Sequence, residues 1–246
     1  MKRISLMWTA LLPAAIGVVL AVSLASAAPA ATKKSFTFDV GSAFGDSDRF
    51  SFTIPEAGCI LAQVKSWARS GSSGTAASQL ALILTGSDRT THYARTDGTA
   101  SSVLPLSASY AAESGDVTRV KTWTISIGNF TRSGTARGTL ELEYPATLAP
   151  CQLRAAASRT PGRVDLSWRY TGKSFSGAFL VERSTDGATW SALSACKKSR
   201  STSTTSYACS DTGLRSGTRY YYRACTSTGT RCGTTNITPT TSARAP

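Results

Sequence analysis

Alternation of apolar and polar residues is the feature that most limits how this chain can fold. In the stretch VDLSWRYTGKSFSGAFLVERSTDGATW (164–190), apolar residues take every second position on two successive segments: Val164, Leu166 and Trp168, then Phe179 and Val181. A period of two sends successive side chains to opposite faces of a strand. Asp186-Gly187 favours the tight turn of a hairpin, because such turns need positive φ. The pattern predicts strands, with Trp168 and Val181 in a core rather than at a ligand.

The same period of two recurs along the rest of the chain, and no segment has the period of an amphipathic helix. In the first half it marks strands near Phe36–Val40, Phe50–Ile54, Ile60–Val64, Trp123–Ile127 and Leu140–Tyr144, and the continuous apolar run Leu80–Leu84 is a further expected strand. Turn clusters rich in Gly, Ser and Asp separate these runs, which favours antiparallel sandwiches. A connector around 144–150 divides the chain. We therefore predict an all-β protein with two β-sandwich domains, 28–149 and 150–239, and a disordered tail, 240–246.

The first 27 residues have the pattern of a signal peptide. Lys2 and Arg3 precede an uncharged apolar run, Ile4–Leu24, and Ala25-Ser26-Ala27 supplies the small residues of a cleavage site. A lone membrane anchor is the alternative, but no basic stop-transfer cluster follows the run. We expect cleavage after Ala27 and a secreted protein, extracellular or periplasmic.

Six cysteines lie beyond this segment: Cys59, Cys151, Cys196, Cys209, Cys225 and Cys232. An even number of cysteines in an exported chain favours disulfides, although six cysteines permit 15 pairings. We expect near neighbours to pair, Cys196 with Cys209 and Cys225 with Cys232, which leaves Cys59 with Cys151. Zinc is the alternative, but there is no C-x-x-C pair and His92 is the only histidine. We expect no metal and no cofactor.

Positive charge is concentrated in the second half of the chain. From Cys151 onward there are fourteen Lys and Arg against four Asp and Glu, a net charge of +10, whereas Ala28–Pro150 has eleven bases and ten acids. One interpretation of this asymmetry is that the second half binds an anionic partner. The other is that the charge only keeps the exported protein soluble. No nucleic-acid-binding motif is present. The expected partner is an anionic polysaccharide or cell-envelope polymer, or another secreted protein.

The second half resembles a fibronectin type III domain over roughly 151–239. The resemblance rests on the V-x-L-x-W strand, on FLVERSTDG and on TGL-x-x-GT-x-Y-x-Y-R-A. It implies an immunoglobulin-like sandwich of seven strands, near 151–157, 163–169, 178–184, 189–194, 205–210, 218–225 and 232–238. It also implies that Trp168 is the core tryptophan and that the hydroxyl of Tyr220 reaches the backbone near Leu214. The first half resembles, by overall pattern alone, the jelly-roll-like domains of the pre-peptidase C-terminal type in secreted bacterial peptidases.

One outward-facing row in the second half is a candidate ligand site. If Tyr220, Tyr222 and Ala224 face the core, alternation turns Arg219, Tyr221 and Arg223 outward on the same strand. An aromatic ring between two guanidinium groups can hold a sugar acid, phosphate or carboxylate. The alternative is that Tyr221 is only a good strand former with arginines beside it.

No arrangement of residues points to catalysis. His92 has Asp88 and Asp97 nearby, but no G-x-S-x-G turn accompanies it and no pair of carboxylates stands out. We therefore predict a non-catalytic binding or adhesion protein. The alternative is a secreted hydrolase, or an accessory or inhibitory partner of one, with its site in the first half around His92.

Overall fold

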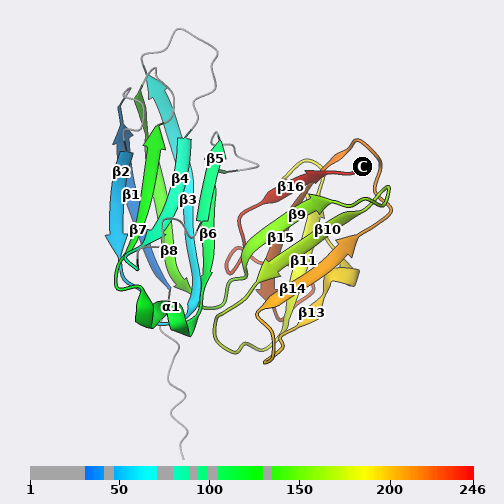
Figure 1. Cartoon of the computed structure of the whole chain (residues 1–246). Coiled ribbons are helices and arrows are strands. Elements are labelled where there is room, and N and C mark those ends of the chain that lie inside the picture. Colours follow the sequence, from blue (N-terminus) through cyan, green and yellow to red (C-terminus); the bar gives the residue numbers. More distant parts are fainter. Residues whose placement is uncertain (1–30, 42–46, 71–79, 89–93, 99–104, 130–134) are drawn as a thin grey trace, which may run out of the picture.

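The computed structural model describes residues 31–41, 47–70, 80–88, 94–98, 105–129 and 135–246, and within them the chain is almost entirely β (Figure 1). The segment predicted to be a signal peptide and His92 lie outside these residues. Figure 1 shows two sandwiches side by side, one built by β1 to β8 and the other by β9 to β16. The predicted all-β class is therefore confirmed.

The N-terminal sandwich consists of two antiparallel sheets of four strands each. One sheet has the order β1 (Thr32–Val40), β8 (Thr135–Ala146), β3 (Gly58–Ser70), β6 (Ser107–Ala112). The other has the order β2 (Ser47–Phe52), β7 (Trp123–Asn129), β4 (Leu80–Gly86), β5 (Ala94–Gly98). Eight strands that alternate between two sheets in this order form a jelly roll, as predicted. A short helix, α1 (Ser114–Arg119), joins β6 to β7.

Alternating apolar residues of both sheets meet in one core. Phe38, Phe52, Val64, Ile125 and Leu140 are among its buried members. Leu80–Leu84 is apolar on both faces in the sequence, and four of its five side chains are buried because β4 lies inside its sheet, between β5 and β7. The alternation seen in the sequence therefore marks the strands that build this core.

The C-terminal sandwich packs a sheet of three strands against a sheet of five. The first has the order β14 (Ser206–Asp211), β10 (Val164–Arg169), β9 (Cys151–Ala157). The second has the order β12 (Ser191–Ala192), β11 (Ala178–Ser184), β15 (Arg219–Ser227), β16 (Thr241–Arg244), and β13 (Lys198–Ser199) also pairs with β11. A 3-10 turn (Ser194–Cys196) precedes β13. This strand order is that of an immunoglobulin-like sandwich.

Two expectations about the end of the chain were wrong. The segment 232–238 forms no strand and makes only an isolated bridge between Ile237 and Cys225. The tail predicted to be disordered instead forms β16, which pairs with β15 from Arg219↔Arg244 to Tyr222↔Thr241. Its polar composition suggested disorder, but an edge strand is stabilised by main-chain hydrogen bonds and by one buried residue, Ala245.

The three disulfides are the predicted ones: Cys59–Cys151, Cys196–Cys209 and Cys225–Cys232. They place the chain in an oxidising compartment, because thiols stay reduced in the cytosol. No helix within the described part of the chain is long and apolar enough to cross a membrane.

A seam of specific contacts joins the two sandwiches. Cys59–Cys151 crosses it, and the small buried cluster around this bond includes Ala111, Ala146 and Ala149. Lys173 Nζ lies 2.9 Å from Glu56 Oε2, and Arg169 forms an ion pair with Glu113. The hydroxyl of Tyr170 donates to the carbonyl oxygen of Thr147 at 2.8 Å. The connector is shorter than predicted, because β8 continues through Ala146. A domain boundary at residue 150 stays a prediction.

We expect the C-terminal sandwich to lose stability at high pH. Burial raises the pKa of Tyr170 and of Tyr222 well above the ordinary value near 10, and the neighbouring Asp211 carboxylate adds to the shift at Tyr222. Both tyrosines ionise in the unfolded chain above pH 10 but stay neutral in the fold, so the free energy of unfolding should fall as pH rises past 10. Urea unfolding between pH 8 and 11 measures this. The Tyr170→Phe/Tyr222→Phe variant should show a weaker pH dependence, and an equal dependence would contradict the assignment.

Candidate functional site

The outer face of β15 and β16 assembles the candidate site. On β15 the burial alternates: Tyr220, Tyr222 and Ala224 point into the core, while Arg219 is exposed and Tyr221 and Arg223 are partly exposed. The inward and outward sets are the ones that the sequence pattern predicted. We call Arg219, Tyr221, Ser242 and Arg244 the arginine face.

Strand pairing places two arginines side by side on this face. Arg219 lies directly opposite Arg244 in the register of β15 and β16, and Tyr221 lies opposite Ser242. Arg219 Nη1 donates to Ser242 Oγ at 3.4 Å, and Arg244 Nη1 donates to the carbonyl oxygen of Gly217 at 3.0 Å. Within the described residues neither guanidinium has a carboxylate partner. Like charges directly opposite each other destabilise a sheet, and an anion between them would remove the repulsion.

Arg223 does not join this pair, although it belongs to the predicted row. Its Nε and Nη2 donate to Glu182 Oε2 at 2.8 and 2.6 Å, and Glu182 is fully buried. Its guanidinium carbon also lies 4.3 Å from the centre of the Trp190 ring. A ligand could recruit Arg223 only by leaving a buried carboxylate without its partner, which is costly. The predicted row is therefore divided: Arg219 and Tyr221 remain on the arginine face, and Arg223 is a structural residue.

The residues predicted to form the core do so. Trp168, Val181, Leu214, Tyr220 and Tyr222 all belong to the second hydrophobic core. The Tyr220 hydroxyl accepts a hydrogen bond from the backbone N–H of Arg215 at 3.1 Å, next to the Leu214 position named from the sequence. This bond ties the turn before β15 to the core, and so fixes where Arg219 begins the strand.

Arg244 is the residue of the candidate site that sequence reasoning missed. It lies in the segment TTSARAP, which was predicted to be disordered. The alternation of Thr241, Ala243 and Ala245 with polar residues was the available signal, but it is short and weakly apolar. Pairing with β15, rather than local pattern, places Arg244 opposite Arg219.

The arginine face supports binding rather than proton transfer. Its residues supply guanidinium and hydroxyl donors and one aromatic ring, while general acid–base catalysis needs a group that titrates near the working pH. In the described ranges, no three His, Cys, Asp or Glu side chains gather where they could hold a metal ion. The alternative site around His92 lies outside the described residues.

Comparisons with known proteins give no family for this chain. No protein-family model and no curated protein sequence matches it. A β-1,2-glucanase from Parabacteroides distasonis is 16% identical with a TM-score of 0.25, over 88% of this chain and 36% of that one. A Lactobacillus rhamnosus β-glucuronidase is 8% identical with a TM-score of 0.26, over 83% and 35%. A Ruminococcus gnavus β-glucuronidase in complex with uronic isofagomine is 4% identical with a TM-score of 0.27, over 82% and 35%. This chain therefore spans little more than a third of their length, and TM-scores this low support no conclusion about function.

Proposed function

We propose that this chain is a secreted, non-catalytic binding protein that holds an anionic polymer, such as an acidic polysaccharide or a cell-envelope polymer, on the arginine face. The single observation behind the proposal is that Arg219 and Arg244 lie opposite each other without a carboxylate partner in the described part of the chain. A polymer with regularly spaced carboxylates or phosphates can accept hydrogen bonds from both guanidinium groups at once.

The surrounding charge supports the same proposal. The C-terminal half has a net charge of +10, which attracts polyanions over distances of about 10 Å at moderate ionic strength. Tyr221 lies two positions after Arg219 on β15, opposite Ser242 on β16, and its partly exposed ring is a surface on which a sugar ring can stack. The strand order and the bond between Tyr220 and Arg215 support the further proposal that this half is a fibronectin type III domain.

Retention on immobilised polygalacturonate across a salt series tests the proposal. The full oxidised chain should be retained at low salt and released as salt rises, because screening weakens the attraction. The Arg219→Ser/Arg244→Ser variant should bind about tenfold more weakly or worse, since it removes two charge-assisted donors.

The matched control removes the same charge elsewhere. Arg159 and Lys197 are exposed and have no ion-pair partner among the described residues. The Arg159→Ser/Lys197→Ser variant should release at nearly the same salt concentration as the unmodified chain. If the two double variants weaken retention equally, net charge alone binds the polymer and the arginine face is not the site.

A further inference from the structure

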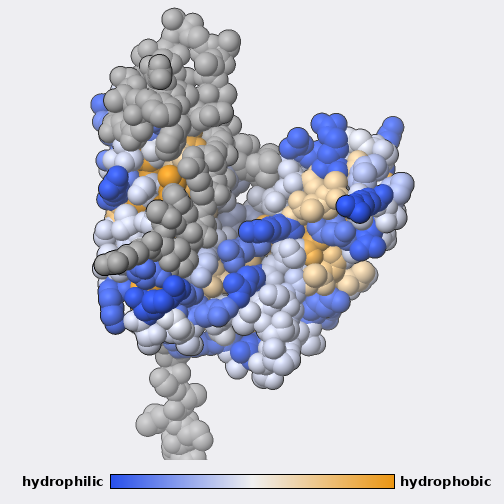
Figure 2. Space-filling view, in the orientation of Figure 1, coloured by the Kyte–Doolittle hydropathy of each residue, from blue (hydrophilic) through white to orange (hydrophobic). Residues whose placement is uncertain are grey.

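A second hollow surface lies on the opposite side of the C-terminal sandwich, on the outer face of β9, β10 and β14. Two adjoining depressions of about 500 and 310 Å³ share Arg154 and Ser167 in their walls. We call the combined hollow the trough. Figure 2 shows mainly hydrophilic and neutral residues over these strands, with small apolar patches between them. The trough has a volume typical of sites for small ligands.

The trough exists because small side chains occupy the outward positions of this sheet. The register sets Ala156 and Ser210 on either side of Asp165, and Ala208 beside Ser167. Ser206 lies opposite Arg169 one step further along β14. Long side chains at these positions would fill the space, so the hollow is built into the sequence of all three strands.

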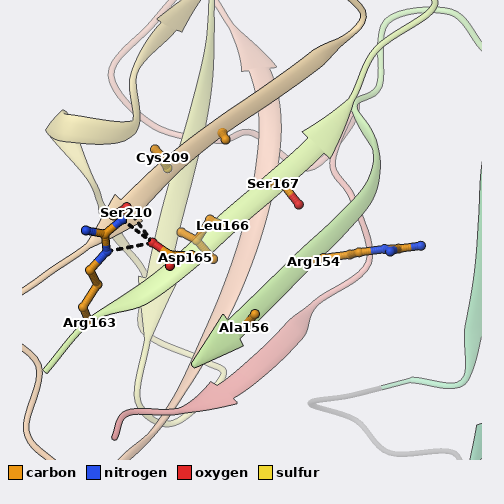
Figure 3. Close-up of a pocket in the computed structure, with 9 residues that line it drawn as sticks. Arg154, Ala156, Arg163, Asp165, Leu166, Ser167, Cys209 and Ser210 are labelled. Atoms are coloured by element: carbon orange, nitrogen blue, oxygen red, sulfur yellow. Dashed lines mark hydrogen bonds and ion pairs between the residues drawn. The ribbon is translucent and has the colours of Figure 1, made fainter. Parts of the chain in front are cut away.

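Among the described residues, the guanidinium of Arg154 in the trough has no partner, whereas the carboxylate of Asp165 already accepts hydrogen bonds from its neighbours. Figure 3 shows Arg163, Asp165 and Ser210 joined by dashed lines, with Arg154 standing apart on β9. Asp165 accepts from Arg163 Nε and from Ser210 Oγ, both at 2.8 Å, and these bonds lower its pKa so that it stays ionised. Arg154 is exposed and forms no hydrogen bond or ion pair with the described residues. The trough therefore has one free positive charge to offer a ligand.

Three residues that line the smaller depression carry a polar atom that is buried without a partner: Gln152 Oε1, Trp168 Nε1 and Arg169 Nε. These atoms have almost no accessible surface, so a ligand in the depression does not reach them. Buried polar atoms are nearly always hydrogen-bonded, and those that are not need an explanation. Gln152 also has a φ of 55°, which non-glycine residues rarely adopt and which strained functional sites often contain. Its backbone N–H donates to Ser109 Oγ at 3.1 Å, and this bond holds the residue in place at the seam.

We infer that the trough is a second binding site, separate from the arginine face, that takes one sugar acid, meaning a small ring with a carboxylate and several hydroxyl groups. The carboxylate accepts hydrogen bonds from the exposed guanidinium of Arg154. The ligand hydroxyls exchange hydrogen bonds with Ser167 and Ser206, two exposed residues that line the smaller depression. A neutral sugar lacks the negative charge that Arg154 requires, and a carboxylate without a sugar ring lacks the hydroxyl groups. The inference does not rest on the proposed function of the arginine face.

NMR titration of the full ¹⁵N-labelled chain with D-galacturonate tests the assignment. Backbone amides of Gln152, Arg154 and Ser167 should shift on addition of the ligand, and those of Arg219 and Arg244 should not. The Arg154→Ser variant should bind about tenfold more weakly or worse, because a charge-assisted hydrogen bond is lost. Arg159→Ser removes the same charge from an exposed position outside the trough and should leave the affinity unchanged.

A second variant and two ligand controls complete the test. Ser167→Leu fills the trough without changing the charge and should abolish binding, while the exposed position of Ser167 leaves the core intact. That variant should be retained like the unmodified chain on immobilised polyphosphate, a polyanion that contains no sugar acid, so failure of this inference and failure of the proposed function are distinguishable. D-galactose and acetate should each cause no localised shifts. Any one of three results would overturn the inference. Acetate could cause shifts equal to those with galacturonate, Arg154→Ser and Arg159→Ser could have equal effects on affinity, or galacturonate could cause no shifts at all.

Discussion

Replacing Glu182 with alanine is expected to lower the free energy of unfolding of the C-terminal sandwich by about 3–5 kcal/mol, the cost of breaking a buried ion pair from one side. Glu182 has no exposed surface and accepts three hydrogen bonds, two from Arg223 and one from the backbone N–H of Cys232 at 3.0 Å. Among the described residues, its loss would leave Arg223, which is itself largely covered, with the Trp190 ring as its one remaining side-chain partner. Urea unfolding of the full chain measures the change.

The controls separate burial from charge. Arg231 lies 3.6 Å from Glu182 Oε1 but its side chain is 63% exposed, so Arg231→Ala should cost far less. Asp165 is a carboxylate on the surface with its own arginine, and Asp165→Ala should likewise cause a small change. If Glu182→Ala proves no more harmful than these two variants, the carboxylate is not an essential part of the fold.

Removing the disulfide between the two sandwiches is expected to have an effect of similar size. Cys59–Cys151 closes a loop with a sequence separation of 92, and the chain-entropy relation gives about 4–5 kcal/mol for a loop of that length. The loop contains most of the N-terminal sandwich, so the Cys59→Ala/Cys151→Ala variant should lower the stability of that sandwich in particular. Scanning calorimetry should show an unfolding transition at lower temperature.

Cys196–Cys209 is the matched comparison. It has a sequence separation of 13 and lies within the C-terminal sandwich, so its removal should cost about 3 kcal/mol and affect the other core. Both bonds contain at least one fully buried cysteine, which makes the loss of packing comparable. If removing Cys196–Cys209 lowers the free energy of unfolding more than removing Cys59–Cys151, the entropy of the unfolded chain does not set the size of the effect, and local packing dominates.

The sequence allowed the strands of both halves to be predicted because alternation is local. Trp168 lies in the core because it takes an inward position on β10, which the pattern in 164–169 already shows. The same reasoning turned Arg219 and Tyr221 outward correctly. It failed for β16, because four polar and small residues have too little apolar alternation to stand out from a disordered tail.

Charged residues were harder to assign, because their roles depend on distant partners. Arg223 and Arg219 look equivalent in the sequence, two outward arginines on one strand. Only Arg223 meets Glu182, a residue 41 positions away, beneath the Trp190 ring. Nothing in the local sequence distinguishes an arginine that neutralises a buried carboxylate from one that remains available to a ligand.

By itself, the sequence determined the all-β class and the inward set of the second core, since each follows from residues close together along the chain. It favoured the disulfides between near neighbours without excluding the other pairings. Only the tertiary structure decided which residues the two candidate surfaces bring together. The pairing of Arg219 with Arg244 and the trough beside Arg154 depend on the register between strands that are distant in sequence. Register is set by the packing of whole sheets, because a shift of one residue would turn every side chain of a strand to the other face.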